Sequence, residues 1–80
     1  MKFKAKHGSY YKMYYNNDEY NILYVGNMWT YKIAYKYNSE LIIHDNRIKW
    51  DSIEAWQSHI NKYTSKVEEI SKEDLFLELL

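Results

Sequence analysis

Apolar and polar residues alternate along much of the first fifty residues of the chain. The clearest stretch is WTYKIAYKY, residues 29–37, where an aromatic or β-branched residue stands at every second position. A period of two over such residue types is typical of a strand with one buried face. We therefore expect one face of this strand to pack in the core. Five residues share that face: Trp29, Tyr31, Ile33, Tyr35 and Tyr37.

Short polar groups divide the other alternating stretches into strands and turns. Residues 10–15 and 20–25 flank the sequence NNDE, whose residue types favour turns, so this region predicts a β-hairpin. Gly26-Asn27 marks the next turn, and Asn38-Ser39-Glu40 marks the one after it.

Residues 41–44 and 47–50 are short apolar runs on either side of Asp45-Asn46. They form either one bulged strand or a tight hairpin. Four or five antiparallel strands are therefore expected over residues 10–50. The first of them carries tyrosine on both faces, so part of the aromatic content is expected at the surface or in a subunit interface. A homodimer is the simplest arrangement that would cover it.

The spacing of the apolar residues changes from two to three or four after residue 50. Asp51 or Ser52 is a suitable N-cap, and Glu54 stands where a capping box places an acid. Ser71 is a second N-cap ahead of the terminal sequence LFLELL. The spacing predicts one or two helices over residues 51–80 that cover one face of the sheet. Their apolar stripe consists of Ile53, Trp56, Ile60, Tyr63, Val67 and Ile70, and its first three residues are expected to pack on the strand at residues 29–37.

These elements predict a single α+β domain over residues 1–80, with an antiparallel sheet of four to five strands (10–50) followed by one or two C-terminal helices (51–80). Residues 1–9 are expected to be a flexible basic arm. The chain contains no cysteine, which excludes disulfides and thiolate metal sites. A chain this short must therefore be stabilised by its aromatic core or by a partner subunit.

Residues that carry catalytic chemistry are scattered along the sequence. His7, His44 and His59 do not show the spacing of metal ligands. His44 and Asp45 are adjacent, so in a strand they would point to opposite faces and could not act as a pair. Two glycines are too few for a phosphate-binding loop. We expect a protein that is not an enzyme and has no catalytic residue, cofactor or metal.

Charge is divided unevenly along the chain, although the net charge is zero. Residues 1–50 carry eight basic and four acidic side chains, whereas residues 51–80 carry three basic and seven acidic ones. Such asymmetry indicates a charged partner. No apolar run approaches the roughly 20 residues that span a bilayer, and the N-terminal sequence MKFKAKHGS is not that of a signal peptide. The expected location is the cytoplasm, without membrane association.

The C-terminal sequence DLFLELL, residues 74–80, resembles the short peptide that binds the sliding clamp of bacterial DNA polymerase. Leu75 and Leu77 match its spaced apolar positions, whereas the glutamine that precedes them is absent and Glu78 replaces a terminal Phe or Leu. The resemblance implies that the tail docks into a groove of a partner protein. From the residues alone, the same segment is equally well explained as a short amphipathic helix that closes the core.

In its size and its high content of Tyr, Asn, Lys and Ile, the whole chain resembles small host-takeover proteins of phages that infect low-GC Gram-positive bacteria. The resemblance implies a non-enzymatic inhibitor that binds a host protein. The sliding clamp is the favoured target, with DNA mimicry by acidic side chains as one mechanism, and a CRISPR nuclease is an alternative target. The residues expected to bind the partner are Glu54, Glu68, Glu69, Glu73, Asp74, Leu75, Phe76, Leu77 and Glu78.

A second function, from a different class, is nucleic-acid binding by the sheet. Basic side chains would follow the phosphates, and neighbouring tyrosines would stack on bases. A solvated strand face explains the same lysines without any ligand, and acids on a helix are likewise explained by exposure to solvent. The residues expected to bind nucleic acid are Lys12, Lys32, Lys36, Arg47 and Lys49.

Overall fold

The structure, a computed structural model, describes residues 3–80, and this part of the chain contains five strands and two helices. In chain order they are β1 (Tyr10–Tyr14), β2 (Tyr20–Val25), β3 (Trp29–Tyr37), β4 (Glu40–Lys49), α1 (Ile53–Tyr63), β5 (Lys66–Ile70) and α2 (Lys72–Leu79). The strands form one antiparallel sheet in the order β4-β3-β2-β1-β5. The predicted α+β class is confirmed.

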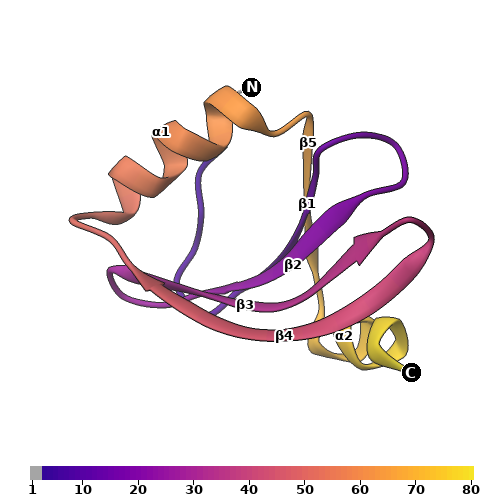
Figure 1. The fold of residues 1–80 in the computed structure, drawn as a ribbon. Helices are drawn as coiled ribbons and strands as arrows, with labels where there is room; N and C mark the ends of the chain where they lie inside the picture. Colours follow the sequence, from indigo (N-terminus) through magenta and orange to yellow (C-terminus); the bar gives the residue numbers. More distant parts are fainter. Residues whose placement is uncertain (1–2) are drawn as a thin grey trace.

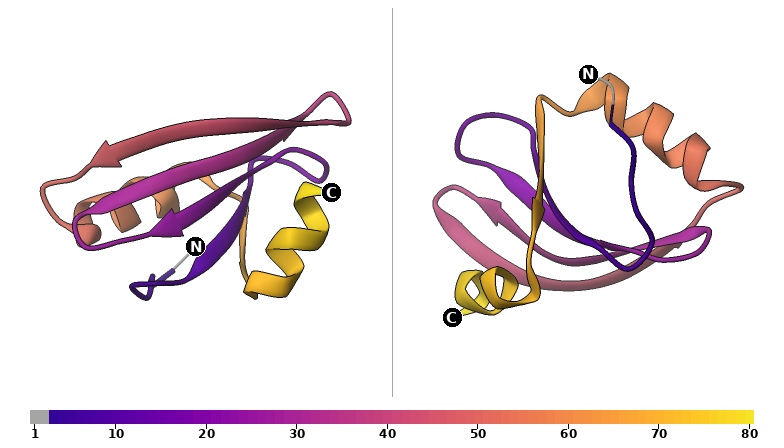
Figure 2. Two further views of the ribbon diagram at one scale, coloured as in Figure 1. Left: turned by 90° about the horizontal axis from the view of Figure 1, so that it is seen from below. Right: turned by 180° about the vertical axis from the view of Figure 1, so that it is seen from behind.

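The sheet is strongly curved, and the two helices lie on its opposite faces (Figure 1 and Figure 2). Helix α1 lies over the concave face, on the path from β4 at one edge to β5 at the other. The concave core contains Tyr11, Met13, Leu23, Val25 and Trp56. The convex core, under α2, contains Tyr20, Ile22, Ala34, Ile70 and Leu75. The prediction that the helices cover one face of the sheet is therefore wrong.

Strand β5 replaces the part of the helix that was predicted over residues 66–70. Helix α1 ends at Tyr63, and its C-cap Thr64 has an extended backbone and donates its N–H to Ile60 O at 2.9 Å. Ser65 then donates its N–H and its hydroxyl to Tyr14 O, both at 3.0 Å, and this starts the pairing with β1. Two apolar residues three apart do not distinguish a helix from a strand in so short a segment. Residues 66–70 form a strand because they pair with the outer edge of β1, whose backbone groups would otherwise be unpaired.

A β-bulge at Ile33 divides the aromatic stripe of β3. Before the bulge, Trp29 and Tyr31 lie on the convex side. After it, Tyr35 lies on the concave side, where Lys32 Nζ is 4.8 Å from the centroid of its ring. A bulge adds one residue to a strand, so it reverses the alternation of side chains beyond that point. The prediction that the stripe forms one core face against α1 is wrong for this reason.

The apolar stripe of α1 itself follows the prediction. Trp56 is buried in the concave core, and Ile53 and Ile60 pack beside it. The side chain of Tyr63, predicted on the same stripe, lies outside the described part of the structure. The helical period was thus informative up to the end of α1, and it failed where the chain enters β5.

Serine caps and turns lie where the sequence placed them. Ser52 and Ser71 begin the two helices, and the Oγ atom of each accepts the backbone N–H of the third residue after it at 3.1 Å. Asn38 and Ser39 have φ values of 53° and 64°, as in the type I′ turn of a two-residue hairpin. Residues 40–49 form one long strand with an irregular register, so the bulged-strand alternative for this region is the correct one.

Residues 3–9 pack on the body of the protein and are not a flexible arm, so that prediction is wrong for this segment. The N–H of Phe3 donates to Asn61 Oδ1 of α1 at 2.9 Å. Its ring contacts Trp56 edge-on, with 5.9 Å between the ring centroids. The hydrophobic contact with the concave core accounts for the ordering, because Phe3 adds apolar area to that core. Residues 1–2 lie outside the described residues.

Candidate functional site

The convex face of the sheet is covered by a helix over only part of its area. Helix α2 lies near the β3–β4 turn, whereas the end of this face near the β2–β3 turn carries no helix (Figure 2). Half-buried aromatic side chains gather on the uncovered part, beside Ile33. We call this group the aromatic surface, and it consists of Tyr10, Tyr24, Trp29, Tyr31 and Ile33.

The rings of the aromatic surface are neighbours in space and are held in place by the backbone. The ring centroids of Tyr10 and Tyr24 are 5.1 Å apart, and those of Tyr24 and Trp29 are 5.6 Å apart. The indole of Trp29 lies against Gly26, where a β-carbon would overlap with it. The N–H of Gly26 also donates to Trp29 O at 2.9 Å. The β2–β3 turn therefore fixes the position of the indole and requires glycine at residue 26.

Two exposed basic side chains border the aromatic surface from the edge strand β4. Lys49 lies opposite Trp29 in the β3–β4 register, and Arg47 lies opposite Tyr31. The guanidinium of Arg47 is 5.6 Å from the centroid of the Trp29 ring, which is a cation–π distance. A hydrogen bond to Asp45 raises the pKa of Tyr31. Within residues 3–80, neither Arg47 nor Lys49 forms an ion pair with a carboxylate.

The structure divides the five predicted nucleic-acid-binding residues between the two faces of the sheet. Arg47 and Lys49 border the aromatic surface. Lys36 also lies on the convex face, but near α2, with its Nζ 6.0 Å from the Tyr20 ring. Lys32 lies on the concave face. Lys12 lies beneath α2 with 13% of its side chain exposed. The five predicted residues therefore do not form one surface, because Lys32 lies on the face opposite to the other four.

Sequence reasoning missed the rings of β1 and β2 as members of the site. Tyr10 and Tyr24 are paired across the β1–β2 ladder, so they lie on the same face. This could have been predicted from the alternation in residues 10–15 and 20–25, because a hairpin that turns at NNDE pairs Tyr10 with Tyr24. The alternation does not indicate which half of the convex face is left uncovered by α2.

The predicted partner-binding acids do not form one surface. Glu54 belongs to α1 on the concave side, whereas Glu73 and Asp74 belong to the first turn of α2 on the convex side. Glu68 and Glu69 are successive residues of β5, so they point to opposite faces. A continuous acidic helix face, as DNA mimicry would need, is absent from residues 51–80 because β5 interrupts the helix.

The apolar residues of the predicted docking tail are also divided. Leu75 is buried in the convex core. Phe76 and Leu77 are exposed, with 58% and 67% of their surface accessible. The interpretation of this segment as a helix that closes the core is therefore correct for Leu75, whereas Phe76 and Leu77 on the outer side of α2 remain exposed to solvent.

A partly buried polar network joins α2 to the sheet through Glu78. Its carboxylate forms an ion pair with Lys12 of β1 and accepts the hydroxyl of Tyr20 at 2.7 Å. Burial by itself raises the pKa of Glu78, but the hydrogen bonds from Lys12 and Tyr20 outweigh it and hold the pKa below the ordinary value of 4.5. Burial and the hydrogen bond to Glu78 raise the pKa of Tyr20 to about 12. Glu78 therefore anchors the helix and is not available to a partner.

No protein-family model, curated protein or solved structure matches this chain. Among residues 3–80, no group of three or more histidine or carboxylate side chains is placed to hold a metal ion. The same residues include no helix long and apolar enough to cross a membrane. Function is therefore inferred from the geometry of the surfaces.

Proposed function

We propose that the protein binds single-stranded nucleic acid on its aromatic surface. The observation that supports this is the position of four aromatic rings and two exposed basic side chains together on the part of the convex face that α2 leaves uncovered. Sheets that bind single strands combine stacking rings with a positively charged path for the backbone in this way.

The chemistry of the surface favours stacking over base-specific hydrogen bonding. Trp29, Tyr24 and Tyr31 offer ring faces, which every base can stack on, so binding is expected to tolerate different sequences. Arg47 and Lys49 stand beside the rings on the exposed edge strand and would contact phosphates. Bases in a duplex are stacked on each other, so a duplex would offer only its phosphates to this surface.

Substitution of Trp29 tests the contribution of stacking. Trp29→Ala is expected to weaken the binding of a fluorescein-labelled oligo(dT) of about ten nucleotides by roughly 1–3 kcal/mol, since one stacked base is lost. Fluorescence anisotropy at low salt measures the change. The matched control is Tyr37→Ala, because Tyr37 is an exposed ring at the other end of β3, with 55% of its surface accessible.

The contradicting result is equal affinity in the two variants. A homodimer, predicted from the exposed aromatic residues, would use the same surface, so the molar mass of the free protein is measured by sedimentation. A stable dimer that Trp29→Ala dissociates, together with no oligonucleotide binding, would replace this proposal with a self-association role for the aromatic surface.

Inhibition of a host protein remains a second proposal, supported by the exposure of Phe76 and Leu77 beside the acids Glu73 and Asp74 on α2. An apolar anchor with an acidic rim fits a groove with basic surroundings, such as the peptide groove of a bacterial sliding clamp.

The double variant Phe76→Ala, Leu77→Ala is expected to weaken clamp binding at least about tenfold, since hot-spot truncations cost more than about 1 kcal/mol each. Surface plasmon resonance with purified clamp measures the affinity. Unchanged affinity in the double variant, or no binding of the wild-type protein, would contradict the inhibitor proposal. The inhibitor proposal places the protein in the cytoplasm of a bacterium.

A further inference from the structure

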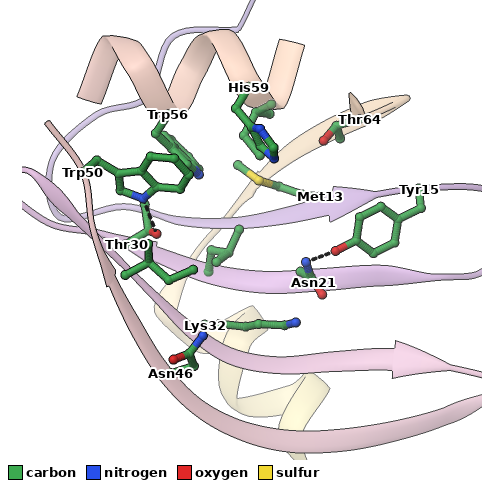
Figure 3. Close-up of a pocket in the computed structure, with 13 residues that line it drawn as sticks. Met13, Tyr15, Asn21, Thr30, Lys32, Asn46, Trp50, Trp56, His59 and Thr64 are labelled. Atoms are coloured by element: carbon green, nitrogen blue, oxygen red, sulfur yellow. Dashed lines mark hydrogen bonds between the residues drawn. The ribbon is translucent and has the colours of Figure 1, made fainter. Parts of the chain in front are cut away.

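A cleft lies between helix α1 and the concave face of the sheet, on the side opposite to the aromatic surface (Figure 3). Its volume is about 210 Å³. Trp56 of α1 and Trp50, which precedes α1, form one wall, and Met13 and Leu23 of the sheet form the floor. Met13 and Trp56 are almost fully buried, with 1% and 2% of their surface accessible.

The surface of the cleft is mainly apolar, and two of the groups that could offer it a polar contact are bonded to each other. The indole N–H of Trp50 donates to Thr30 Oγ1 at 3.0 Å, and the backbone N–H of Trp50 donates to Met28 O at 2.9 Å. These two bonds fix the position of the Trp50 indole against the sheet. The first of them also occupies the hydroxyl of Thr30, the buried polar side chain of β3 that lines the cleft.

Lys32 brings a positive charge to this apolar cleft. Its side chain extends from β3 along the face that looks toward α1 (Figure 3). Its ammonium lies 4.8 Å from the centroid of the Tyr35 ring. Within the described chain, the ion pairs are made by Lys6, Lys12 and Lys66, and none of them involves Lys32. Lys32 is a half-buried residue beside a mainly apolar cavity, and within residues 3–80 its ammonium has no carboxylate partner.

We propose that the cleft binds a small monocarboxylate whose body is about the size of one aromatic ring, with its carboxylate at Lys32 Nζ. The volume suits such a body, since an engineered apolar cavity of about 150 Å³ is known to hold benzene. The walls supply apolar contact on both sides of a ring, and the ammonium supplies a charge-assisted hydrogen bond. This site is independent of the proposed nucleic-acid surface, because it lies on the other face of the sheet.

Phenylacetate is the probe, and the neutral phenylacetamide of nearly equal shape is its control. Phenylacetate is expected to bind about tenfold more tightly than phenylacetamide, because a hydrogen bond to a charged group is stronger than one between neutral groups. Titration followed by amide and side-chain NMR shifts is expected to move the signals of Trp50, Trp56 and Leu23. This comparison needs no variant, so it does not depend on whether a substitution folds.

Lys32→Met removes the charge and keeps most of the apolar stem of the side chain. It is expected to lower the affinity for phenylacetate about tenfold and leave phenylacetamide binding unchanged. Lys36→Met on the convex face is the control and should leave both affinities unchanged. Equal affinity of wild type for acid and amide, or no saturable shift at these residues, would overturn the proposal. Oligonucleotide affinity should be the same in Lys32→Met and wild type, so failure here is distinguishable from failure of the nucleic-acid proposal.

Discussion

Reversal of the charges of Arg47 and Lys49 is expected to lower the affinity for a single-stranded oligonucleotide about a hundredfold at low salt. Each residue would neutralise one phosphate, and contacts of this kind supply most of the sequence-independent affinity. The double variant Arg47→Glu, Lys49→Glu removes two such contacts and adds repulsion. Both side chains are exposed on the edge strand β4, so the fold should tolerate the change.

The matched control is Lys62→Glu, a change of the same kind on α1, across the sheet from the aromatic surface. It should leave oligonucleotide affinity within about twofold, because its charge does not border the rings. Circular dichroism establishes that both variants are folded. A loss of log affinity in the control of at least half that in the double variant, in proportion to the charge changed, would mean that only net charge matters, and this would contradict a localised site.

Glu78→Gln is expected to lower the free energy of unfolding by about 2 kcal/mol, because it leaves the ammonium of Lys12 nearly buried without a negative partner. The comparison is Glu69→Gln, which breaks the exposed ion pair of Glu69 with Lys6, where the two side chains are 47% and 73% accessible. That change should cost less than about 1 kcal/mol. Urea unfolding measures both. Similar small losses would show that Glu78 does not anchor α2.

The same network predicts how stability depends on pH. The pKa of Glu78 is lower in the folded protein than its ordinary value of 4.5. Its contribution to the free energy of unfolding is therefore present above pH 4.5 and is lost as the pH falls through the folded pKa. The pKa of Tyr20 is raised from 10.0 to about 12, so its contribution is present below 10 and is lost as the pH rises through about 12. Burial alone would lower the pKa of Lys12, but the bond to Glu78 and nearby negative charge raise it above 10.5, and its contribution is lost in the same alkaline range. In the variant Glu78→Gln, the loss of stability at acidic pH should be smaller than in the wild-type protein.

Local patterns in the sequence were sufficient for β1 to β3, for the cap at Ser71 and for α1. They left open whether residues 41–50 form one bulged strand or a hairpin, and whether Asp51 or Ser52 caps α1. Alternation in β1 and β2 and the turn residues Asn38-Ser39 are local features, and the structure follows them. The bulge at Ile33 has no local signature, because only the pairing of β3 with β2 reveals the extra residue. Strand β5 was missed because its pairing partner, β1, lies more than fifty residues earlier in the chain.

The site was predictable only in part for the same reason. Arg47 and Lys49 were identified as basic residues of the sheet, and they do border the aromatic surface. The ion pair between Lys12 and Glu78 joins residues 66 apart in sequence, so the sequence could not indicate that Lys12 is occupied. Because the α2 anchor also decides which rings stay uncovered, the location of the surface follows from tertiary packing and not from periodicity.

Salt dependence of oligonucleotide binding tests the central claim most directly. The affinity of the wild-type protein for labelled oligo(dT) is measured by anisotropy over a range of salt concentrations, beside Arg47→Glu, Lys49→Glu and beside a duplex of equal length. We predict saturable binding with a slope of log affinity against log salt of about −1.4, from two phosphate contacts on a single strand. The slope should approach zero in the double variant, and the duplex should bind more weakly. No saturable binding at low salt, or the same slope in both proteins, would contradict binding of single strands by the aromatic surface.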